Sequence, residues 1–269
     1  MFSGVVQPGI VSLFSSTGSE PLGLFSSRTD ASLPSDSFLC FLEDSSSSPP
    51  PAPPATLIAS PSVRTDVDGK DSDEKEGYTL SQTVLHLQSP TLRTTYIRCP
   101  PQGSKEDLGL KHPWIHIQVR DMGREWSFEV GVVDKAGREG IIRFSTFQKE
   151  PRLKLLNPPL LHLPLSFPSS SSHRLTGWST IDVNLPSLLP HFSSASLARN
   201  EDDGSSDTEM PSRSAHIASN VSRTQVPSGL YSHVSYIKIY ATCRLRRIWF
   251  SESGPGQSVP WEFQLFGPA

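Results

Sequence analysis

Apolar and polar side chains alternate in the stretch Trp114-Ile115-His116-Ile117-Gln118-Val119-Arg120, which places three aliphatic residues on one face of a β-strand. Turn signals at residues 121–124 and 134–137 separate this stretch from further alternating segments at 125–132 and 142–144. Short alternating segments joined by turns are typical of antiparallel sheets. The pattern predicts a meander of at least three antiparallel strands.

The C-terminal part continues the strand pattern. Apolar residues occupy odd positions through 237–245 and even positions at 248–250, so the phase slips by one residue. Such a slip indicates a bulge or a tight turn near Arg246. Alternation at 181–185 predicts another strand, followed by one helical turn that begins with a proline. Alternation at 261–265 predicts a last short strand.

Many short strands with little helical periodicity predict an all-β fold, an antiparallel β-sandwich or jelly-roll-like single domain. The chain has 269 residues, of which only 35% are hydrophobic, with 25 prolines and 44 serines. We therefore expect one domain over 1–269, interrupted by disordered insertions at 45–76 (rich in serine and proline, then acidic) and 193–230 (rich in serine and acidic). A weaker irregular stretch is expected at 157–172. The two insertions carry 11 of 27 acidic and 6 of 24 basic residues, so the remainder has a net charge of about +2.

Several classes of protein are excluded or disfavoured by this sequence. No segment approaches the run of about 18 apolar residues that spans a membrane. The first residues lack the basic and apolar regions of a secretory signal. The chain has three widely spaced cysteines and no CxxC pair, which argues against a disulfide framework and a zinc site. A reducing compartment, cytosol or nucleus, is the default expectation.

Motifs for catalysis and metal binding are not found in the sequence. His112 and His116 straddle a proline on or beside a strand, where a spacing of four does not form a metal pair, so we expect solvated or edge histidines. We expect Cys99 and Cys243 to be small buried hydrophobic residues rather than reactive thiols. No catalytic residue, cofactor or metal site is therefore predicted.

The most prominent charged motif is the basic run Arg244-Leu245-Arg246-Arg247. Arg244 and Arg246 lie on the strand face opposite the apolar one, where we expect them to point to solvent, and Lys238 extends that face. These three residues and the adjacent Arg247 are candidates for binding an acidic protein surface. The alternative is an ordinary solvated sheet face with cross-strand partners such as Glu129 or Asp182. Nucleic-acid binding is disfavoured, because a net charge of about +2 creates a weak field.

The tryptophans allow a different interpretation. Trp126 falls on the inward phase of its strand, whereas Trp114 and Trp249 fall on the outward phase and are candidates for interface anchors. Carbohydrate-binding modules use exposed tryptophans on sandwich faces, so a sugar-binding module is a distant alternative. One exposed row of outward tryptophans would favour it.

Blocks distributed along the chain carry a family resemblance. They are Met1-Phe2, Gln7-Pro8-Gly9-Ile10-Val11-Ser12-Leu13-Phe14, Gly18-Ser19-Glu20-Pro21-Leu22, Thr94-Thr95-Tyr96-Ile97-Arg98-Cys99-Pro100, Leu108-Gly109-Leu110-Lys111-His112-Pro113, Phe128-Glu129-Val130, Arg143-Phe144, Gly177-Trp178 with Ile181, Ile239 to Ser251, and Pro260-Trp261-Glu262-Phe263-Gln264-Leu265-Phe266. In this order they resemble the cilia- and flagella-associated protein 20 family. The chain departs from the family pattern in an insertion after Cys40, in a rewritten stretch between 149 and 177, and in the segment 193–230.

The resemblance implies a β-sandwich without known catalytic residues. Family members lie in axonemes and at basal bodies, where they form the inner junction that seals the B-tubule onto the A-tubule of doublet microtubules. They are linked to tubulin modification and ciliary motility, with nuclear roles in some lineages. The implied partners are tubulin and neighbouring axonemal proteins, without a membrane. A divergent nuclear or cytosolic scaffold in a lineage lacking cilia is the leading alternative.

Overall fold

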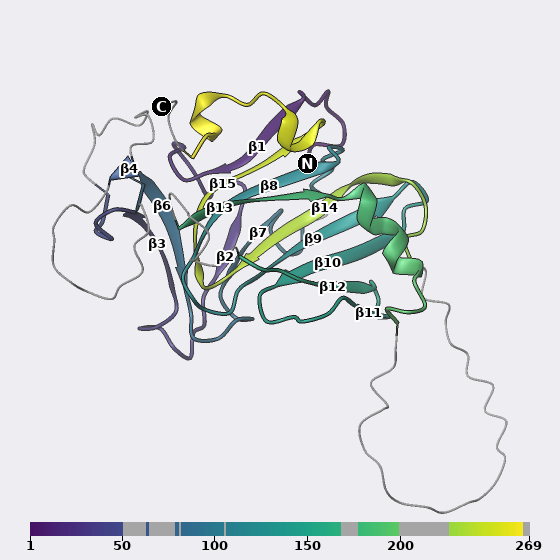
Figure 1. Ribbon diagram of the computed structural model, residues 1–269, viewed down its shortest axis with the longest axis horizontal. Helices are drawn as coiled ribbons and strands as arrows, with labels where there is room; N and C mark the ends of the chain where they lie inside the picture. The colour runs from purple at the N-terminus through teal and green to yellow at the C-terminus, as the bar shows by residue number, and fades with distance from the viewer. Residues whose placement is uncertain are drawn as a thin grey trace, which may run out of the picture.

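The structure is a computed structural model in which two β-sheets pack face to face (Figure 1). It describes residues 1–50, 63–64, 79–80, 82–104, 106–167, 177–198 and 226–265. Most of the two expected insertions, 45–76 and 193–230, lies outside the described residues. The prediction of an all-β sandwich is confirmed.

The six-stranded sheet has the order β13–β8–β15–β6–β3, with β1 paired to β15 beyond the end of β6. Its strands are β1 (Ile10–Ser15), β3 (Phe38–Glu43), β6 (Thr83–Gln88), β8 (Trp114–Asp121), β13 (Trp178–Asn184) and β15 (Cys243–Ser251). All of its strand pairs are antiparallel. β15 stands in the middle of this order, so it is the central strand of the sheet.

The seven-stranded sheet has the order β11–β12–β10–β9–β14–β7–β2. Its strands are β2 (Ser26–Arg28), β7 (Tyr96–Cys99), β9 (Ser127–Asp134), β10 (Glu139–Ser145), β11 (Arg152–Lys154), β12 (Leu160–Pro164) and β14 (Tyr231–Tyr240). Only the β10–β12 pair is parallel. The described residues also include a small hairpin of β4 (Val63–Arg64) and β5 (Thr79–Leu80), and the 3-10 helices η1 (Pro186–Ser193), η2 (Gly254–Gly256) and η3 (Trp261–Phe263).

The hydrophobic core lies between the two sheets. The aliphatic face predicted for β8 is fully buried, since Ile115, Ile117 and Val119 are all 0% exposed. Phe128 and Ile239 of the other sheet are equally inaccessible and belong to the same core cluster. Strict alternation therefore predicted correctly which face of these strands points into the core between the sheets.

The predicted three-strand meander is correct only in its second half. β9 and β10 form an antiparallel hairpin, but β8 belongs to the opposite sheet, where it lies between β13 and β15. The connection between β8 and β9 covers residues 122–126, and at about 3.3 Å per residue it is long enough to cross the roughly 10 Å between packed sheets. Alternation identifies a buried face, and it does not identify the sheet to which a strand belongs.

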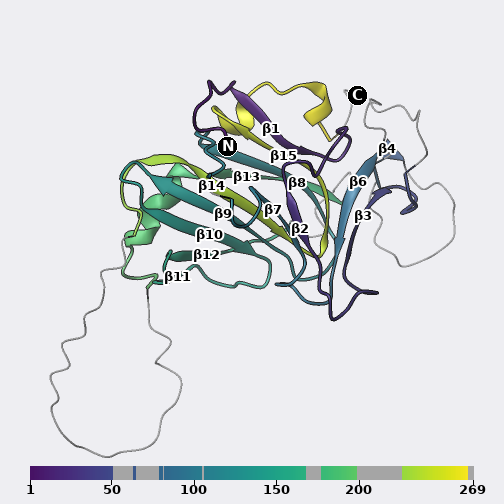
Figure 2. The same cartoon turned by 180° about the vertical axis from the view of Figure 1, so that it is seen from behind.

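The C-terminal alternating segment, residues 237–250, forms two strands in different sheets. β14 ends at Tyr240 in the seven-stranded sheet, and β15 begins at Cys243 in the six-stranded sheet (Figure 2). The odd positions stay apolar through this crossing because both strands turn those side chains toward the shared core. The bulge predicted near Arg246 is confirmed by a register shift between Leu245 and Arg247.

Two further expectations require correction. Residues 261–265 form no strand; η3 forms there instead, because the Phe263 N–H donates to the Pro260 carbonyl and the Gln264 N–H to the Trp261 carbonyl. Within 157–172, expected to be irregular, β12 pairs with both β10 and β11. The helical turn predicted after β13 is confirmed, and it extends over all of η1. None of the helices within the described residues has the length and apolar character needed to cross a membrane.

Gly131 of β9 provides a test of this packing. A Cβ atom there would lie 2.5 Å from the Tyr236 ring and would also overlap the Ser235 hydroxyl. We expect Gly131→Ala to lower the free energy of unfolding by about 1–3 kcal/mol, as overpacking does. Urea denaturation measures the change. Gly4→Ala is the matched control, because its added methyl meets nothing within 4 Å. Equal stability of the two variants would contradict the close approach of Tyr236 to β9.

Candidate partner-binding site

The structure corrects the expected position of the β15 arginines. Arg244, Arg246 and Arg247 are 7%, 2% and 7% exposed, so the expectation that Arg244 and Arg246 point to solvent is wrong. Their side chains do lie on the face opposite the core, but other segments of the chain cover that face. An outward strand phase did not mean exposure here.

Arg244 is held by the carboxylate of Asp44, which follows β3. Its Nη1 donates to Oδ1 of Asp44 at 2.7 Å and to the Asp44 carbonyl at 3.0 Å. Arg120 donates to the same Oδ1 at 3.0 Å, and the Trp178 indole N–H donates to Oδ2 at 2.8 Å. The Asp44 side chain is 0% exposed. This network is a structural ion pair, and it does not use the expected partners Glu129 or Asp182.

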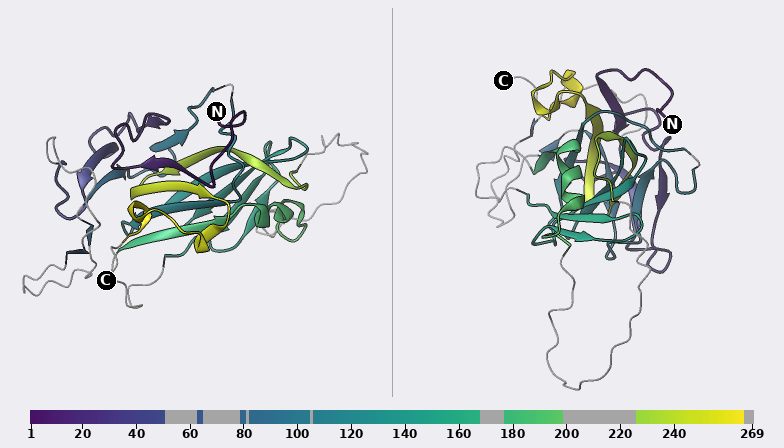
Figure 3. Two further views of the ribbon diagram at one scale, coloured as in Figure 1. Left: turned by 90° about the horizontal axis from the view of Figure 1, so that it is seen from above. Right: turned by 90° about the vertical axis from the view of Figure 1, so that its right-hand side faces the viewer.

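The C-terminal segment, drawn in yellow in Figure 3, contacts Arg246 through Glu262 and Arg247 through Phe263. Arg246 donates to the side-chain oxygens of Gln82 and Gln118 and to the carbonyl of Glu262. Its acceptors are all neutral, and burial together with the adjacent Arg247 lowers its pKa to about 10. The Arg247 guanidinium lies 4.3 Å from the centroid of the Phe263 ring. The C-terminal segment therefore shields both cations from water.

The two outward tryptophans are not freely exposed. Trp114, His116 and Trp249 form a stack, with centroids 6.5 Å apart for the first pair and 4.8 Å for the second. Trp249 is 4% exposed and has the edge of Phe263 against it at 5.2 Å. The exposed tryptophan row expected of a sugar-binding module does not form on this face of the described structure.

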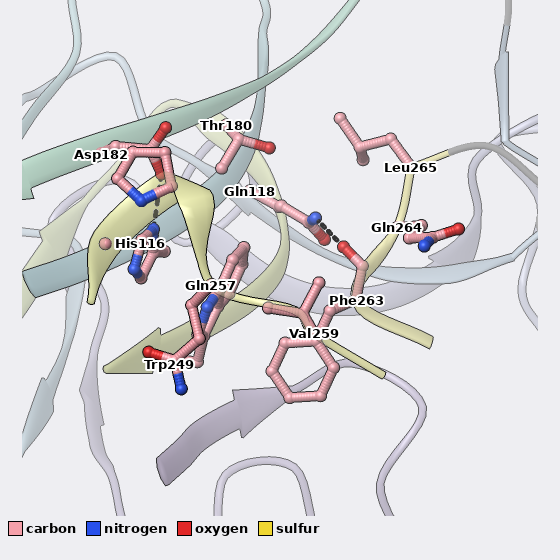
Figure 4. Close-up of a pocket in the computed structure, with 12 residues that line it drawn as sticks. His116, Gln118, Thr180, Asp182, Trp249, Gln257, Val259, Phe263, Gln264 and Leu265 are labelled. Atoms are coloured by element: carbon pink, nitrogen blue, oxygen red, sulfur yellow. Dashed lines mark hydrogen bonds and ion pairs between the residues drawn. The ribbon is translucent and has the colours of Figure 1, made fainter. Parts of the chain in front are cut away.

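A Ser–His–Asp arrangement, missed by the sequence analysis, lies beside this stack. His116 Nδ1 is 2.5 Å from Oδ1 of Asp182 (Figure 4). Its Nε2 is 2.7 Å from the hydroxyl of Ser251. A neutral imidazole that donates to Asp182 accepts from Ser251, as in the triad of serine hydrolases. The arrangement could have been found only from the cross-strand pairing of Asp182 with His116. That pairing cannot be inferred without the register of β13 against β8.

The burial of Ser251 argues against a hydrolase. Its exposed fraction is 0%, and its hydroxyl also accepts a hydrogen bond from the Gly254 N–H at 3.2 Å. A nucleophile must contact the atom that it attacks, and Ser251 does not line the pocket of about 380 Å³ that His116 and Asp182 border. The arrangement instead joins β13, β8 and β15 through side-chain hydrogen bonds. His112 and His116 are only 3% and 2% exposed, so the expectation of solvated or edge histidines is wrong for both.

The cysteines occupy the positions expected of hydrophobic residues. Cys99 and Cys243 are 0% and 1% exposed. Burial raises the pKa of Cys99 to about 12 and also raises that of Cys243, which disfavours the reactive thiolate. Within the described ranges, no group of three or more His, Cys, Asp or Glu side chains is arranged to hold a metal ion.

Lys238 is the one predicted cation that reaches a partly open face. It lies on the outer face of the seven-stranded sheet, so the expectation that it extends the face of Arg244 and Arg246 is wrong. Its Nζ is 3.7 Å from the centroid of the Tyr96 ring and 4.5 Å from that of Tyr240. Burial lowers its pKa, with repulsion from Arg98 and Arg143 acting in the same direction and Glu129 opposing them. Aromatic rings rather than a carboxylate therefore orient this ammonium group.

Glu129 is the polar centre of the same face. Its Oε1 accepts from Nε of Arg143 at 2.7 Å and from the Tyr240 hydroxyl at 2.8 Å, and its Oε2 accepts from the Tyr236 hydroxyl at 3.2 Å. Glu129 is 5% exposed, so its charge is satisfied internally. Sequence reasoning named Lys238 but missed the neighbouring Arg98 and Arg143, which join it only through strand pairing.

Comparison with known proteins relates this chain to proteins of one name. A family model described as the CFA20 domain matches residues 71–198. The chain is 26% identical over 190 residues to cilia- and flagella-associated protein 20 of Chlamydomonas reinhardtii, covering 70% of this chain and 76% of that protein. For the proteins of the same name from Paramecium tetraurelia and Caenorhabditis elegans the identities are 24% and 23%, each over 70% of this chain, covering 76% and 71% of those proteins. The chain resembles the cilia- and flagella-associated protein 20 family.

The match to the CFA20 domain spans β5 to η1 and ends before β14 and β15. It therefore contains Glu129, Arg143 and the β9–β10 hairpin, whereas Lys238 and the three arginines of β15 lie beyond it. No protein named as an enzyme is among these relatives of the CFA20 type. The partner-binding role of Lys238, Arg244, Arg246, Arg247, Trp114 and Trp249 stays a prediction.

The ion pair at Asp44 can be tested by removing one cation. Arg244→Met retains apolar bulk but deletes two hydrogen bonds to Asp44, while Arg120 still contacts it. We expect the free energy of unfolding to fall by about 3 kcal/mol, because a buried carboxylate loses part of its compensation. Urea denaturation measures the loss, with Arg124→Met, at an exposed site, as control. A loss below about 0.5 kcal/mol would contradict a structural role.

His162 gives this domain a specific pH dependence. Burial, followed by the charges of Arg143 and Lys154, lowers its pKa from 6.5 to about 4, and Nε2 forms a hydrogen bond with the Ser145 hydroxyl at 2.7 Å. The folded state therefore binds fewer protons than the unfolded state, so stability falls as the pH drops from about 6.5 towards 4. His162→Gln should flatten this slope, as followed by thermal unfolding at several pH values. His191→Gln, at an exposed site, should leave it unchanged.

Proposed function

We propose that this chain is a non-enzymatic structural protein of cilia and flagella that binds axonemal microtubules. The observation that carries the proposal is its similarity, over 70% of its length, to cilia- and flagella-associated protein 20 of an alga, a ciliate and a nematode. The finer role is that of the inner junction between A- and B-tubules, with tubulin and neighbouring axonemal proteins as partners. Axoneme organisation, ciliary motility and tubulin modification follow from that position.

The physical features of the chain support a structural role. The core joins both sheets in one cluster, and the outer face of the six-stranded sheet is cross-linked by the Asp44, Gln118 and His116 hydrogen-bond networks. Ser251, Cys99 and Cys243 are buried away from any substrate. A rigid sandwich of this kind can hold two partners at a fixed separation.

Localisation in a flagellated cell tests this proposal. We expect a tagged copy expressed in Chlamydomonas reinhardtii to enter the flagellum and to remain with the axoneme after detergent extraction. Purified protein should also co-sediment with microtubules. The tag alone is the control for both measurements. A copy that is excluded from flagella and accumulates in the nucleus or the soluble cytosol would contradict the proposal and favour the divergent scaffold.

A further inference from the structure

Six polar side chains form one row across the outer face of the seven-stranded sheet, whose strands lie side by side in Figure 2. Cα partners on neighbouring strands point to the same face, so the row follows directly from the strand registers. It crosses six strands at about 4.8 Å per strand and is therefore roughly 24 Å long. We call it the basic row, and its members in spatial order are Arg98, Lys238, Glu129, Arg143, His162 and Arg152.

The basic row has an excess of positive charge. Its one carboxylate, Glu129, is paired with Arg143, and the low pKa of His162 keeps that imidazole neutral at pH 7. Among the described residues, no carboxylate lies within 4.0 Å of the charged groups of Arg98, Lys238 or Arg152. The row therefore contains four cationic side chains and one carboxylate, whose charge is already paired within the protein.

Two of these cations are positioned by tyrosine rings. The Arg98 guanidinium lies 4.3 Å from the centroid of Tyr236, and the Lys238 ammonium lies over both Tyr96 and Tyr240. Tyr236 and Tyr240 are themselves fixed by donating hydrogen bonds to Glu129. A ring orients a cation without neutralising it, so part of the entropy cost of binding an anion is already met in the free protein.

We propose that the basic row binds an acidic polypeptide segment through its aspartate and glutamate side chains. This inference rests on the proposed function, because it assigns the surface and the chemistry by which the protein would hold its partner. Carboxylates complement the row in charge, and they form bidentate pairs with arginine.

Two features of the row favour a polypeptide over a nucleic acid. Proteins that hold single strands stack bases on exposed aromatic faces, but Tyr96, Tyr236 and Tyr240 are only 5–8% exposed and are covered by the cations. The Glu129 carboxylate also interrupts the positive charge at the middle of the row. Glu129 is paired with Arg143 there, so discrete side-chain carboxylates can avoid that point, whereas the continuous charge of a phosphate backbone gains no partner at it.

The test compares two triple variants with the same change of charge. The row variant is Arg98→Gln with Lys238→Gln and Arg152→Gln. The control is Lys111→Gln with Arg124→Gln and Lys135→Gln, at exposed sites away from the row. Binding of a labelled decaglutamate peptide is measured by fluorescence anisotropy, and binding to microtubules by co-sedimentation. We expect the row variant to weaken peptide binding about tenfold and the control less than about twofold, with wild-type affinity falling as salt rises.

A gain of function keeps the inference testable if the row variant unfolds. Ser26 of β2 is the Cα partner of Arg98 and extends the row by one strand. Ser26→Arg should therefore tighten decaglutamate binding, and thermal unfolding reports whether each variant is folded.

The outcomes separate the two proposals. Equal loss in both triple variants, or no binding of decaglutamate by the wild type, would overturn the basic row as an acidic-peptide site. Tighter binding of a single-stranded DNA of equal charge would also overturn it, in favour of nucleic acid. If microtubules bind the row variant as well as they bind the wild type, the inference fails and the proposed function stands. Row-dependent peptide binding without microtubule binding would support the inference and count against the proposed function.

Discussion

Burial of charge in β15 constrains the rest of the six-stranded sheet. β15 is paired with β8 along one edge and with β6 and β1 along the other, and all of its residues are buried. A guanidinium in such a position is very costly unless acceptors surround it. Those acceptors are supplied by Asp44, Gln82, Gln118 and the Glu262 carbonyl. The turn after β3, the start of β6, the middle of β8 and the C-terminal segment are therefore held together by one strand.

The sequence predicts local features of this fold well and its long-range features poorly. The buried face of β8 and the bulge at Arg246 could be predicted because alternation and its phase slip are properties of adjacent residues. The assignment of β8 to the sheet opposite β9 could not be predicted, because the strands of both sheets turn an apolar face toward the core. Arg244 and Arg246 were placed correctly on the outward phase, but their burial could not be predicted. Arg244 is covered by Asp44, which is distant in the sequence. Arg246 is covered by Glu262, which lies in a segment that was wrongly expected to form a strand.

The two outer faces of the sandwich have different consequences for binding. On the six-stranded sheet, η3 covers Arg247 and Trp249, so these side chains already make contacts within the protein. On the seven-stranded sheet, Lys238 and Arg98 lie against tyrosine rings, and among the described residues no carboxylate lies within 4.0 Å of either charged group. The outward phase of β14 identified Lys238 as a candidate. Its alignment with Arg143 and Arg152 could not be predicted, because it requires the β9–β10 register and the parallel pairing of β10 with β12.

The Ser251–His116–Asp182 network shows why geometry alone does not define an enzyme. Its distances match those of a triad, yet the polar atoms that form it have partners within the protein, since Asp182 receives the imidazole N–H and the Gly254 N–H donates to Ser251. Catalysis requires donors aimed at a charge that develops on a substrate, and a nucleophile that the substrate can reach. Here the same three side chains bind β13, β8 and β15 to one another and to η2. A hydrogen-bonded connection across three strands resists shear between them, and a protein that works by holding two partners in place benefits from that rigidity.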